Sequence, residues 1–396
     1  YSSSSLDYNI NLNKLDFEFH PQKLALNELS LMIGESDFSI NGVFQNYIPF
    51  ALKDEKLEGL FNVRSKLIDI DQLYVDDHSD SSDIALEDTL IDTNILVEVF
   101  SIPENIDFTL STSVNQLIYD SLNIEKIQGK LKVKDASFEF SDISMDLLNG
   151  SFKMEGNYKA ISKKRASIGI NMDVSNISFD KAYLYFNSVK KYASAIKYFD
   201  GDFSTTLNMI LILDEEYYPV YEKINADGNL ISENVTLLDN SIFEKLDKID
   251  ENLIKENNKI KDLNLTYHIK NGLFTIDKTL IKFKDFDANV YGSTSNTQDI
   301  DYTIESEIPF SFVNKSSSGI TDFFSNTNVK DIPVFIKVGG TVVSPTFSTN
   351  LNFDKSDIKE NVISAAKEKI KDFKNEALIE AQKKADQIVK EAQKKA

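Results

Sequence analysis

Short stretches in which apolar and polar residues alternate around a glycine recur along almost the whole chain. A typical stretch is SDFSINGVFQNY at 36–47, in which Phe38 and Ile40 alternate with polar residues. A period of two is the pattern of a β-strand with one apolar and one polar face. The unit surrounds eight glycines: Gly42, Gly59, Gly129, Gly156, Gly228, Gly272, Gly292 and Gly340.

Glycine inside a strand marks a bend, a bulge or a close approach of backbone. Its repetition along a series of strands joined by short polar turns predicts a long, strongly coiled antiparallel meander. The predicted fold class is therefore mainly β with a few helices, and the apolar side of the coiled sheet would form a groove. A C-terminal amphipathic helix completes the expected architecture.

Changes of pattern divide the chain into segments. Strand patterns fill 1–75, the N-terminal β-groove segment, and resume over 95–353. Between them, residues 76–94 are acidic, rich in serine and weakly periodic, which predicts a flexible insertion. Within the second β-groove region, apolar spacings of three and four predict helices near 180–200, capped by Asp180 and Gly201, and at 241–256.

Residues 354–396 form a segment of a different kind. The sequence EAQKKA occurs at 380–385 and again at 391–396, and an eleven-residue offset keeps an apolar stripe in line on a helix. Residues 355–396 carry a net charge of +3 and leave −23 on the rest of the chain. A solvated helix or coiled coil is favoured over a helix lying on an anionic surface, because the later stripe is mostly alanine.

Composition excludes several classes of function. A net charge of −20 with only two arginines, Arg64 and Arg165, argues against nucleic acid as a partner. The chain has no cysteine, and His20, His78 and His268 lack the spacing of metal ligands, so we expect no metal and no cofactor. Phosphate loops, nucleophile elbows and tuned carboxylate pairs are also missing from the sequence, which predicts that the protein is not an enzyme.

Apolar residues of one parity along the strands are the candidates for the lining of the groove. They would replace water around lipid acyl chains, a gain of about 25 cal/mol per Å2 of apolar area buried. They would equally form an ordinary core if helices covered them, and both interpretations remain open at this stage. The candidates are Phe38, Ile40, Phe44, Phe152, Met154, Leu207, Met209, Leu211, Phe286, Val290, Ile336 and Val338.

Several runs, in their order, make the chain resemble the C-terminal region of the AsmA-like family of envelope proteins in Bacteroidetes-type bacteria. The closest is IPENIDFTLSTSVNQLIYDSLNIEKIQGKLKVKDASFEF at 102–140. The others are IGESDFSINGVFQNY (33–47), KLEGLFNVRSKLIDIDQL (56–73), FNSVKKYASAIKYFDGDFSTTLNM (186–209), DYTIESEIP (301–309) and PVFIKVGGTVVSPTFS (333–348).

The resemblance implies a periplasmic, β-rich protein tethered to the inner membrane of a Gram-negative bacterium. AsmA-like and TamB-like proteins are similar to bridge-like lipid-transfer proteins, so the implied partner is phospholipid. The implied role is lipid transport between the inner and outer membranes and outer-membrane biogenesis. The alternative is a periplasmic scaffold that regulates protein targeting or assembly at the outer membrane. The chain opens YSSSSLDYN, which we interpret as the interior of a longer protein with any membrane anchor upstream.

Overall fold

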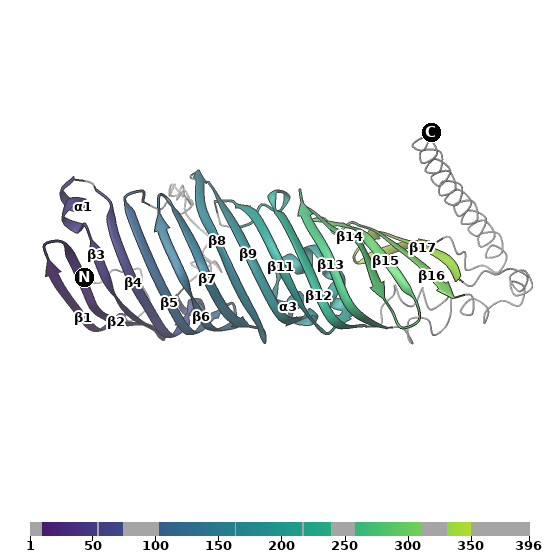
Figure 1. The fold of residues 1–396 in the computed structure, drawn as a ribbon, viewed down its shortest axis with the longest axis horizontal. Helices are drawn as coiled ribbons and strands as arrows, with labels where there is room; N and C mark the ends of the chain where they lie inside the picture. The colour runs from purple at the N-terminus through teal and green to yellow at the C-terminus, as the bar shows by residue number, and fades with distance from the viewer. Residues whose placement is uncertain are drawn as a thin grey trace, which may run out of the picture. The chain divides into compact units, whose positions relative to one another are not determined.

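The computed structural model describes residues 10–53, 55–73, 103–162, 164–215, 218–238, 258–309 and 331–349. These residues are 73% strand and 12% helical, and their 18 strands belong to one sheet (Figure 1). The prediction of a mainly β fold with a few helices is confirmed. The predicted acidic insertion at 76–94, the helix at 241–256 and the tail at 354–396 lie outside the described residues.

Packing divides the chain into two compact units. The first comprises Tyr1–Ala193, Gly201–Ser232 and Asn264–Phe274, and the second comprises Ser194–Asp200, Glu233–Leu263 and Thr275–Ala396. Strands that lie wholly or mostly in the first unit include β1 (Ile10–His20), β2 (Lys23–Ile33), β3 (Ser36–Gln45), β4 (Leu57–Asp69), β5 (Ile106–Tyr119), β6 (Leu122–Lys134), β7 (Ser137–Leu147), β8 (Gly150–Ser162), β9 (Arg165–Ser178), β11 (Asp202–Leu213) and β12 (Asn225–Leu237).

Each of these strands pairs with the next through antiparallel ladders, with one exception. β4 and β5 run parallel, with Leu57 opposite Ile106 and Asp69 opposite Ile118. The expectation of a wholly antiparallel meander is therefore wrong at this pair. The reason is the long connection, because parallel neighbours need a crossover of a dozen residues or more whereas antiparallel neighbours need only a tight turn.

The second unit contains strands that follow the same plan. β15 (Asp287–Ser295) pairs antiparallel with β16 (Ile300–Pro309), which pairs with β17 (Asp331–Thr341), which pairs with β18 (Ser344–Thr349). The remaining strands are β10 (Phe199–Asp200), β13 (Lys259–Lys270) and β14 (Leu273–Lys282). Of the eight glycines, Gly272 lies in the turn between β13 and β14, with φ of 75°, and not inside a strand.

The helices are few and short. They are α1 (Tyr47–Lys53), α2 (Ile70–Leu73), α3 (Phe179–Tyr185), α4 (Asn187–Tyr192) and the 3-10 turns η1 (Ser194–Tyr198) and η2 (Tyr221–Lys223). One continuous helix was expected near 180–200, but Phe186 is extended (φ −105°, ψ 109°) and separates α3 from α4. The expected N-cap Asp180 lies in the first turn of α3, and Ser178 occupies the cap position.

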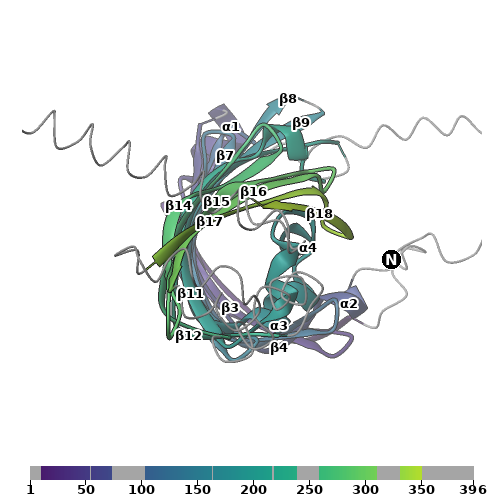
Figure 2. The same cartoon turned by 90° about the vertical axis from the view of Figure 1, so that its right-hand side faces the viewer.

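Helices α3 and α4 lie on the inner side of the curled strands of the first unit (Figure 2). Phe179 of α3 stacks on Phe203 of β11, with ring centroids 4.6 Å apart, and Phe186 lies 6.4 Å from Phe152 of β8. Since Phe152 and Phe203 point to the apolar side of their strands, these contacts identify the inner side of the first unit as its apolar face.

Candidate functional site

The strand register of the first unit joins the apolar positions into ladders that cross the sheet. In an antiparallel or parallel pair, directly opposite residues point to the same face. One ladder runs Phe19, Leu24, Phe44, Gly59, Phe108, Val133, Phe138, Tyr158, Ile168 and Leu211. The next runs Phe17, Leu26, Gly42, Phe61, Leu110, Leu131, Phe140, Gly156, Ile170, Met209 and Ala226.

Every member of these two ladders is apolar or glycine, so together with the parallel rows beside them they form one continuous surface, here called the apolar face. The second ladder crosses eleven strands, which at about 4.8 Å per strand gives a length of about 50 Å. The acyl chains of one bilayer leaflet occupy a depth of about 15 Å. The apolar face is therefore several times longer than one acyl chain.

The glycines in the ladders lie beneath large side chains of neighbouring strands. A side chain at Gly42 would overlap the Phe61 ring, and one at Gly156 would overlap the Phe140 ring. Gly228 lies beneath Tyr267, whose hydroxyl is 2.9 Å from Thr205 Oγ1. The glycines thus make room for rings that lie flat along the sheet, in addition to easing its curvature.

The first unit brings eight of the twelve predicted residues onto the apolar face, on strands β3, β8 and β11. Phe152 and Leu211 are buried, and the other six are half-buried. Sequence reasoning left out residues that occupy the same apolar face, although the same alternation marks them. These are Phe61, Phe108, Leu110, Leu131, Ile170 and Met172.

The second unit holds the other four predicted residues. Val290 and Ile336 both face Ile304 of β16, and Val338 faces Tyr302. Burial raises the pKa of Tyr302 to about 12, and its hydroxyl lies 2.7 Å from Thr294 Oγ1. These three predicted residues therefore lie on one face of β15–β17.

Phe286 departs from this arrangement. It lies in the connection between β14 and β15 and stacks on Phe283, with ring centroids 4.7 Å apart. The sequence pattern placed it in a strand, but its backbone carbonyl instead accepts the Phe283 N–H at 3.0 Å and closes a turn. Phe286 is thus a turn residue, unlike the three strand residues of the second unit.

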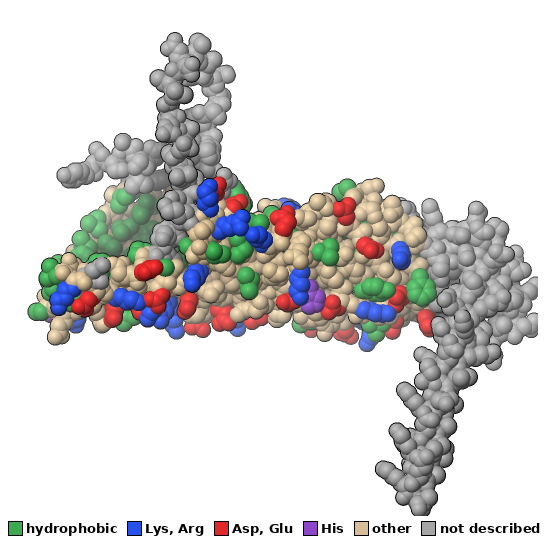
Figure 3. Space-filling view, turned by 90° about the horizontal axis from the view of Figure 1, so that it is seen from above, with side chains coloured by type: hydrophobic (Ala, Val, Ile, Leu, Met, Phe, Trp, Pro, Cys, Tyr) green, Lys and Arg blue, Asp and Glu red, His purple; other side chains and the backbone are tan. Residues whose placement is uncertain are grey.

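Among the described residues, the helices that contact β3–β6 are α1 and α2, and α2 lies at a strand end, where Asp71 accepts the Asp120 N–H in the turn after β5. Rings of Phe44, Phe61 and Phe108 meet edge to face, with centroids 4.7 to 6.0 Å apart, yet all three remain half-buried. Hydrophobic side chains gather in a hollow at the N-terminal end of the molecule (Figure 3). We call this part, residues 36–45, 57–69 and 106–134, the open section.

Strands β8, β9 and β11 have a different distribution of burial. The apolar-face residues near both strand ends are buried, as Val174 and Ala166 are on β9 and Phe203 and Leu213 are on β11. Mid-strand residues are half-buried and form what we call the central strip: Met154, Ile170, Met172, Leu207 and Met209. The same order of buried ends and half-buried middle appears on β8, where Phe152 and Tyr158 flank Met154.

Helices α3 and α4, residues 179–192, cross this part of the apolar face, and we call them the strap. They leave the sheet at Ser178, opposite Asp202, where β9 ends and β11 begins. They reach Tyr221, which lies beyond the other end of β11: the Tyr192 hydroxyl is 3.3 Å from the Tyr221 carbonyl oxygen. Lys191 Nζ lies 3.6 Å from the centroid of the Tyr221 ring.

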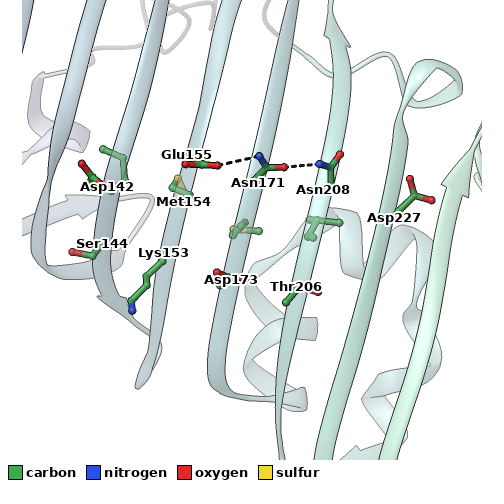
Figure 4. Close-up of a pocket in the computed structure, with 13 residues that line it drawn as sticks. Asp142, Ser144, Lys153, Met154, Glu155, Asn171, Asp173, Thr206, Asn208 and Asp227 are labelled. Carbon is green, nitrogen blue, oxygen red and sulfur yellow. Dashed lines mark hydrogen bonds between the residues drawn. The ribbon is translucent and has the colours of Figure 1, made fainter.

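The opposite face is polar. Asn171 Nδ2 donates to Glu155 at 3.3 Å, and Asn208 Nδ2 donates to Asn171 at 2.5 Å, so a hydrogen-bonded row crosses β8, β9 and β11 (Figure 4). A groove of about 550 Å3 runs along this row and ends at Asp227. Its rims are carboxylates, amides and Lys153, and such groups are well solvated without a ligand.

The described residues contain no candidate metal-binding cluster. Among them, no group of three or more His, Asp or Glu side chains could hold a metal ion. His20 lies 3.0 Å from Glu18 and His268 lies 2.6 Å from Asp227, each at the polar surface, whereas His78 is outside the described residues. The helices in the described part of the chain are all too short or too polar to cross a membrane.

Comparison with known proteins finds no relative of the chain. No family model matches the chain, and neither the curated proteins nor the solved structures contain a match to it. Function must therefore be inferred from the apolar face and its register, and the AsmA-like resemblance remains an expectation.

Proposed function

We propose that the protein binds lipid acyl chains on its apolar face and supports phospholipid transport between two membranes, without catalysing a reaction. The observation that carries the proposal is the unbroken pair of apolar ladders across at least ten strands of the first unit. A closed core would bury such ladders. Here most of their mid-strand members remain half-buried, and extended accessible apolar surface is characteristic of binding sites.

The energetics favour lipid over a smaller apolar ligand. Each methylene group moved from water to an apolar surface contributes about 0.8 kcal/mol, so a long acyl chain gains far more than the entropy it loses on binding. The charged head group would stay at the edge of the sheet, near the polar strand ends. A face about 50 Å long accommodates several chains in succession, which suits transfer better than storage of one molecule.

Phospholipid of the two envelope membranes is the ligand that the AsmA-like resemblance favours. On this proposal the protein acts in the periplasm, tethered to the inner membrane, and serves outer-membrane biogenesis. The polar outer face, with its rows of paired lysines and carboxylates such as Lys134 and Asp107 at 2.7 Å, would face the aqueous surroundings.

Native mass spectrometry of gently extracted protein, followed by uptake of fluorescent phospholipid from vesicles, tests the proposal. Leu131→Asp introduces a charge into the open section, where Leu131 faces Leu110. Gln128→Asp adds the same charge at an exposed position of the same strand and serves as the control. We expect bound phospholipid and uptake in the wild type and the control, and a loss in Leu131→Asp. A lipid-free wild type that takes up none would refute the proposal.

One observation favours the scaffold as a second candidate. Strand β1 forms an antiparallel ladder with β2, and its apolar side chains are exposed, Phe19 to 72%. An exposed strand of this kind can take up a strand from another protein. Phe19→Lys would then abolish crosslinking to envelope proteins in cells, whereas Leu131→Asp, which acts on lipid uptake, would leave that crosslinking unchanged.

A further inference from the structure

Helix α1 lies in a connection that is much longer than its strands require. β3 and β4 are antiparallel neighbours, which a turn of two residues can join, yet residues 46–56 separate them. The connection contains five consecutive apolar residues, IPFAL at 48–52. Ile48 is 38% exposed and Leu52 is 78% exposed, and an apolar run of this kind at a surface indicates a functional contact.

Hydrogen bonds hold this helix at the edge of the sheet, where β3 ends and β4 begins (Figure 1). The Tyr47 hydroxyl donates to the His20 carbonyl oxygen at 2.8 Å, at the end of β1. The Asn46 side-chain amide donates to the Lys56 carbonyl oxygen at 2.8 Å, just before β4. Because the connection is fastened at both ends, α1 has a defined orientation on this edge.

One side of α1 is apolar and accessible to solvent. Ile48, Ala51 and Leu52 are exposed, and their spacing of three and four residues places them on one face of the helix. Phe50 of the same helix is half-buried, as is Phe44 of the open section, which lies three residues before the helix. Apolar side chains therefore continue from the open section, over the edge of the sheet, to the exposed side of α1.

The two edges of the open section differ in charge. The edge opposite α1 is formed by α2 and by the turns after β2 and β5. These residues, all of them described, contain the carboxylates of Glu35, Asp71 and Asp120 and neither lysine nor arginine. The connection at 46–56 has two lysines and two carboxylates, so its net charge is zero. An anionic lipid surface would repel the acidic edge and accept the neutral, apolar edge.

The α1 edge has a second exposed apolar side chain further along the sheet. The register places Asp107 opposite Lys134 and Ser137 opposite Lys159, so the same edge continues from β5 to the end of β8. Ile161, near the end of β8, is 58% exposed. At about 4.8 Å per strand, β4 and β8 are about 19 Å apart, so this edge offers two separate apolar points to a lipid surface.

From these observations we infer that α1 inserts Ile48 and Leu52 into a phospholipid bilayer, and that acyl chains enter the open section over this edge of the sheet. The inference rests on the proposed lipid binding and assigns its point of entry to residues 46–56. Insertion replaces the water around the exposed side of α1 with hydrocarbon. An acyl chain that leaves the bilayer along α1 then meets Phe44 and the apolar face without crossing open water.

The chain contains no tryptophan, so a single introduced tryptophan reports on its own position alone. Leu52→Trp places this reporter on the exposed side of α1, and Tyr119→Trp places it on the opposite edge, where Tyr119 is 55% exposed. Each variant is mixed with vesicles of phosphatidylethanolamine and phosphatidylglycerol, with and without brominated acyl chains. We expect a blue shift of the fluorescence and quenching by bromine for Leu52→Trp, and neither effect for Tyr119→Trp.

A second pair of variants tests whether this contact serves entry. Leu52→Asp puts a charge on the inserting side of α1, and Gln45→Asp puts the same charge at an exposed position of β3 next to it. We expect Leu52→Asp to slow uptake of fluorescent phospholipid from the vesicles by about tenfold, and Gln45→Asp to leave it unchanged. Uptake of the same phospholipid from detergent micelles should be equal in both variants, because neither changes the apolar face.

Two results would overturn the inference and leave the proposed function intact: the same response from both tryptophans, or uptake from vesicles by Leu52→Asp at the wild-type rate. A loss of uptake from micelles as well as from vesicles in Leu52→Asp would place the defect in the apolar face and would also overturn it. If the wild type takes up phospholipid from neither source, the proposed function fails, and entry at α1 fails with it even where Leu52→Trp inserts.

Discussion

The open section and the strapped strands β8–β11 are built from the same ladders but differ in what covers them. In the ladder that includes Phe61 and Ile170, every position on both sides is apolar or glycine. On β4–β6 these residues are half-buried along most of each strand, and on β8–β11 the strand ends are buried while the middle stays accessible. The alternation of the strands defines an apolar face, and a short insertion between β9 and β11 decides how much of that face water reaches.

The largest expected difference between the two regions is in the free energy of unfolding that is lost when an aromatic ring is removed. Phe179→Ala empties a position that is 1% exposed and stacked on Phe203, so we expect a loss of about 3–5 kcal/mol in the free energy of unfolding. Phe61→Ala in the open section removes a half-buried ring and should cost less than half as much. Urea unfolding followed by circular dichroism measures both, and equal losses would contradict the distinction.

Glycine substitutions compare how closely backbone and side chains surround the same kind of position in the two regions. A Cβ at Gly156 would overlap the Gly169 carbonyl oxygen as well as the Phe140 ring, and backbone cannot move aside. We expect Gly156→Ala to cost about 1–3 kcal/mol. At Gly59 the nearest atoms belong to the Phe61 and Phe108 rings, which can shift into the open section. Thermal unfolding should show a smaller decrease in Tm for Gly59→Ala.

A buried tyrosine beside β11, one of the strap-covered strands, also predicts that stability depends on pH. Burial raises the pKa of Tyr267 above its ordinary value, although the hydrogen bond to Thr205 partly opposes this. Because the folded state holds the neutral phenol more strongly than the unfolded chain does, its contribution is complete below about pH 10. That contribution decreases as the pH rises through the folded pKa.

Tyr267→Phe should remove this part of the alkaline destabilisation and cost about 1 kcal/mol at neutral pH through the lost hydrogen bond. Chemical denaturation of the variant and the wild type at pH 8 and at pH 11 would measure both effects. A variant whose stability falls with pH as steeply as that of the wild type would show that Tyr267 does not contribute to the alkaline destabilisation.

The smallest effect is expected from Lys191, at the α4 end of the strap. Lys191→Gln removes the cation–π contact with Tyr221, worth about 0.5–1 kcal/mol, and leaves the α3 end intact. Urea unfolding followed by circular dichroism should show a loss of this size or smaller, and a loss as large as that of Phe179→Ala would contradict the expectation. Lys190→Gln on the same helix is the matched control, since Lys190 Nζ lies 3.5 Å from Asn187 Oδ1 of its own helix.

Much of the fold follows from the local sequence pattern. The features that the sequence did not predict depend on residues far away in the chain. The alternation around Phe38 and Ile40 assigns both residues correctly to one face, because side chains of a strand alternate regardless of the neighbouring strand. That Gly42 lies beneath the Phe61 ring depends on register with β4, which local sequence does not specify. The break at Phe186 was missed because the apolar spacings on either side of it match one continuous helix.

The candidate residues divide in the same way. Those in regular strands, such as Leu207 and Met209, fall on the predicted face, and Phe286 fails because a turn interrupts the pattern there. The strap was predicted as a helix, but its path from one end of β11 to the other depends on strand curvature. Curvature accumulates over the whole sheet and leaves no local signature.

The parallel pairing of β4 with β5 has a consequence for the order of folding. Every other pairing described within β1–β9 joins neighbours through at most eleven residues, so it closes a small loop and forms early. Leu57 and Ile106 are about 50 positions apart, so joining β4 to β5 costs more chain entropy and comes later. We therefore expect β1–β4 and β5–β9 to form as two separate nuclei, and their docking to limit the folding rate.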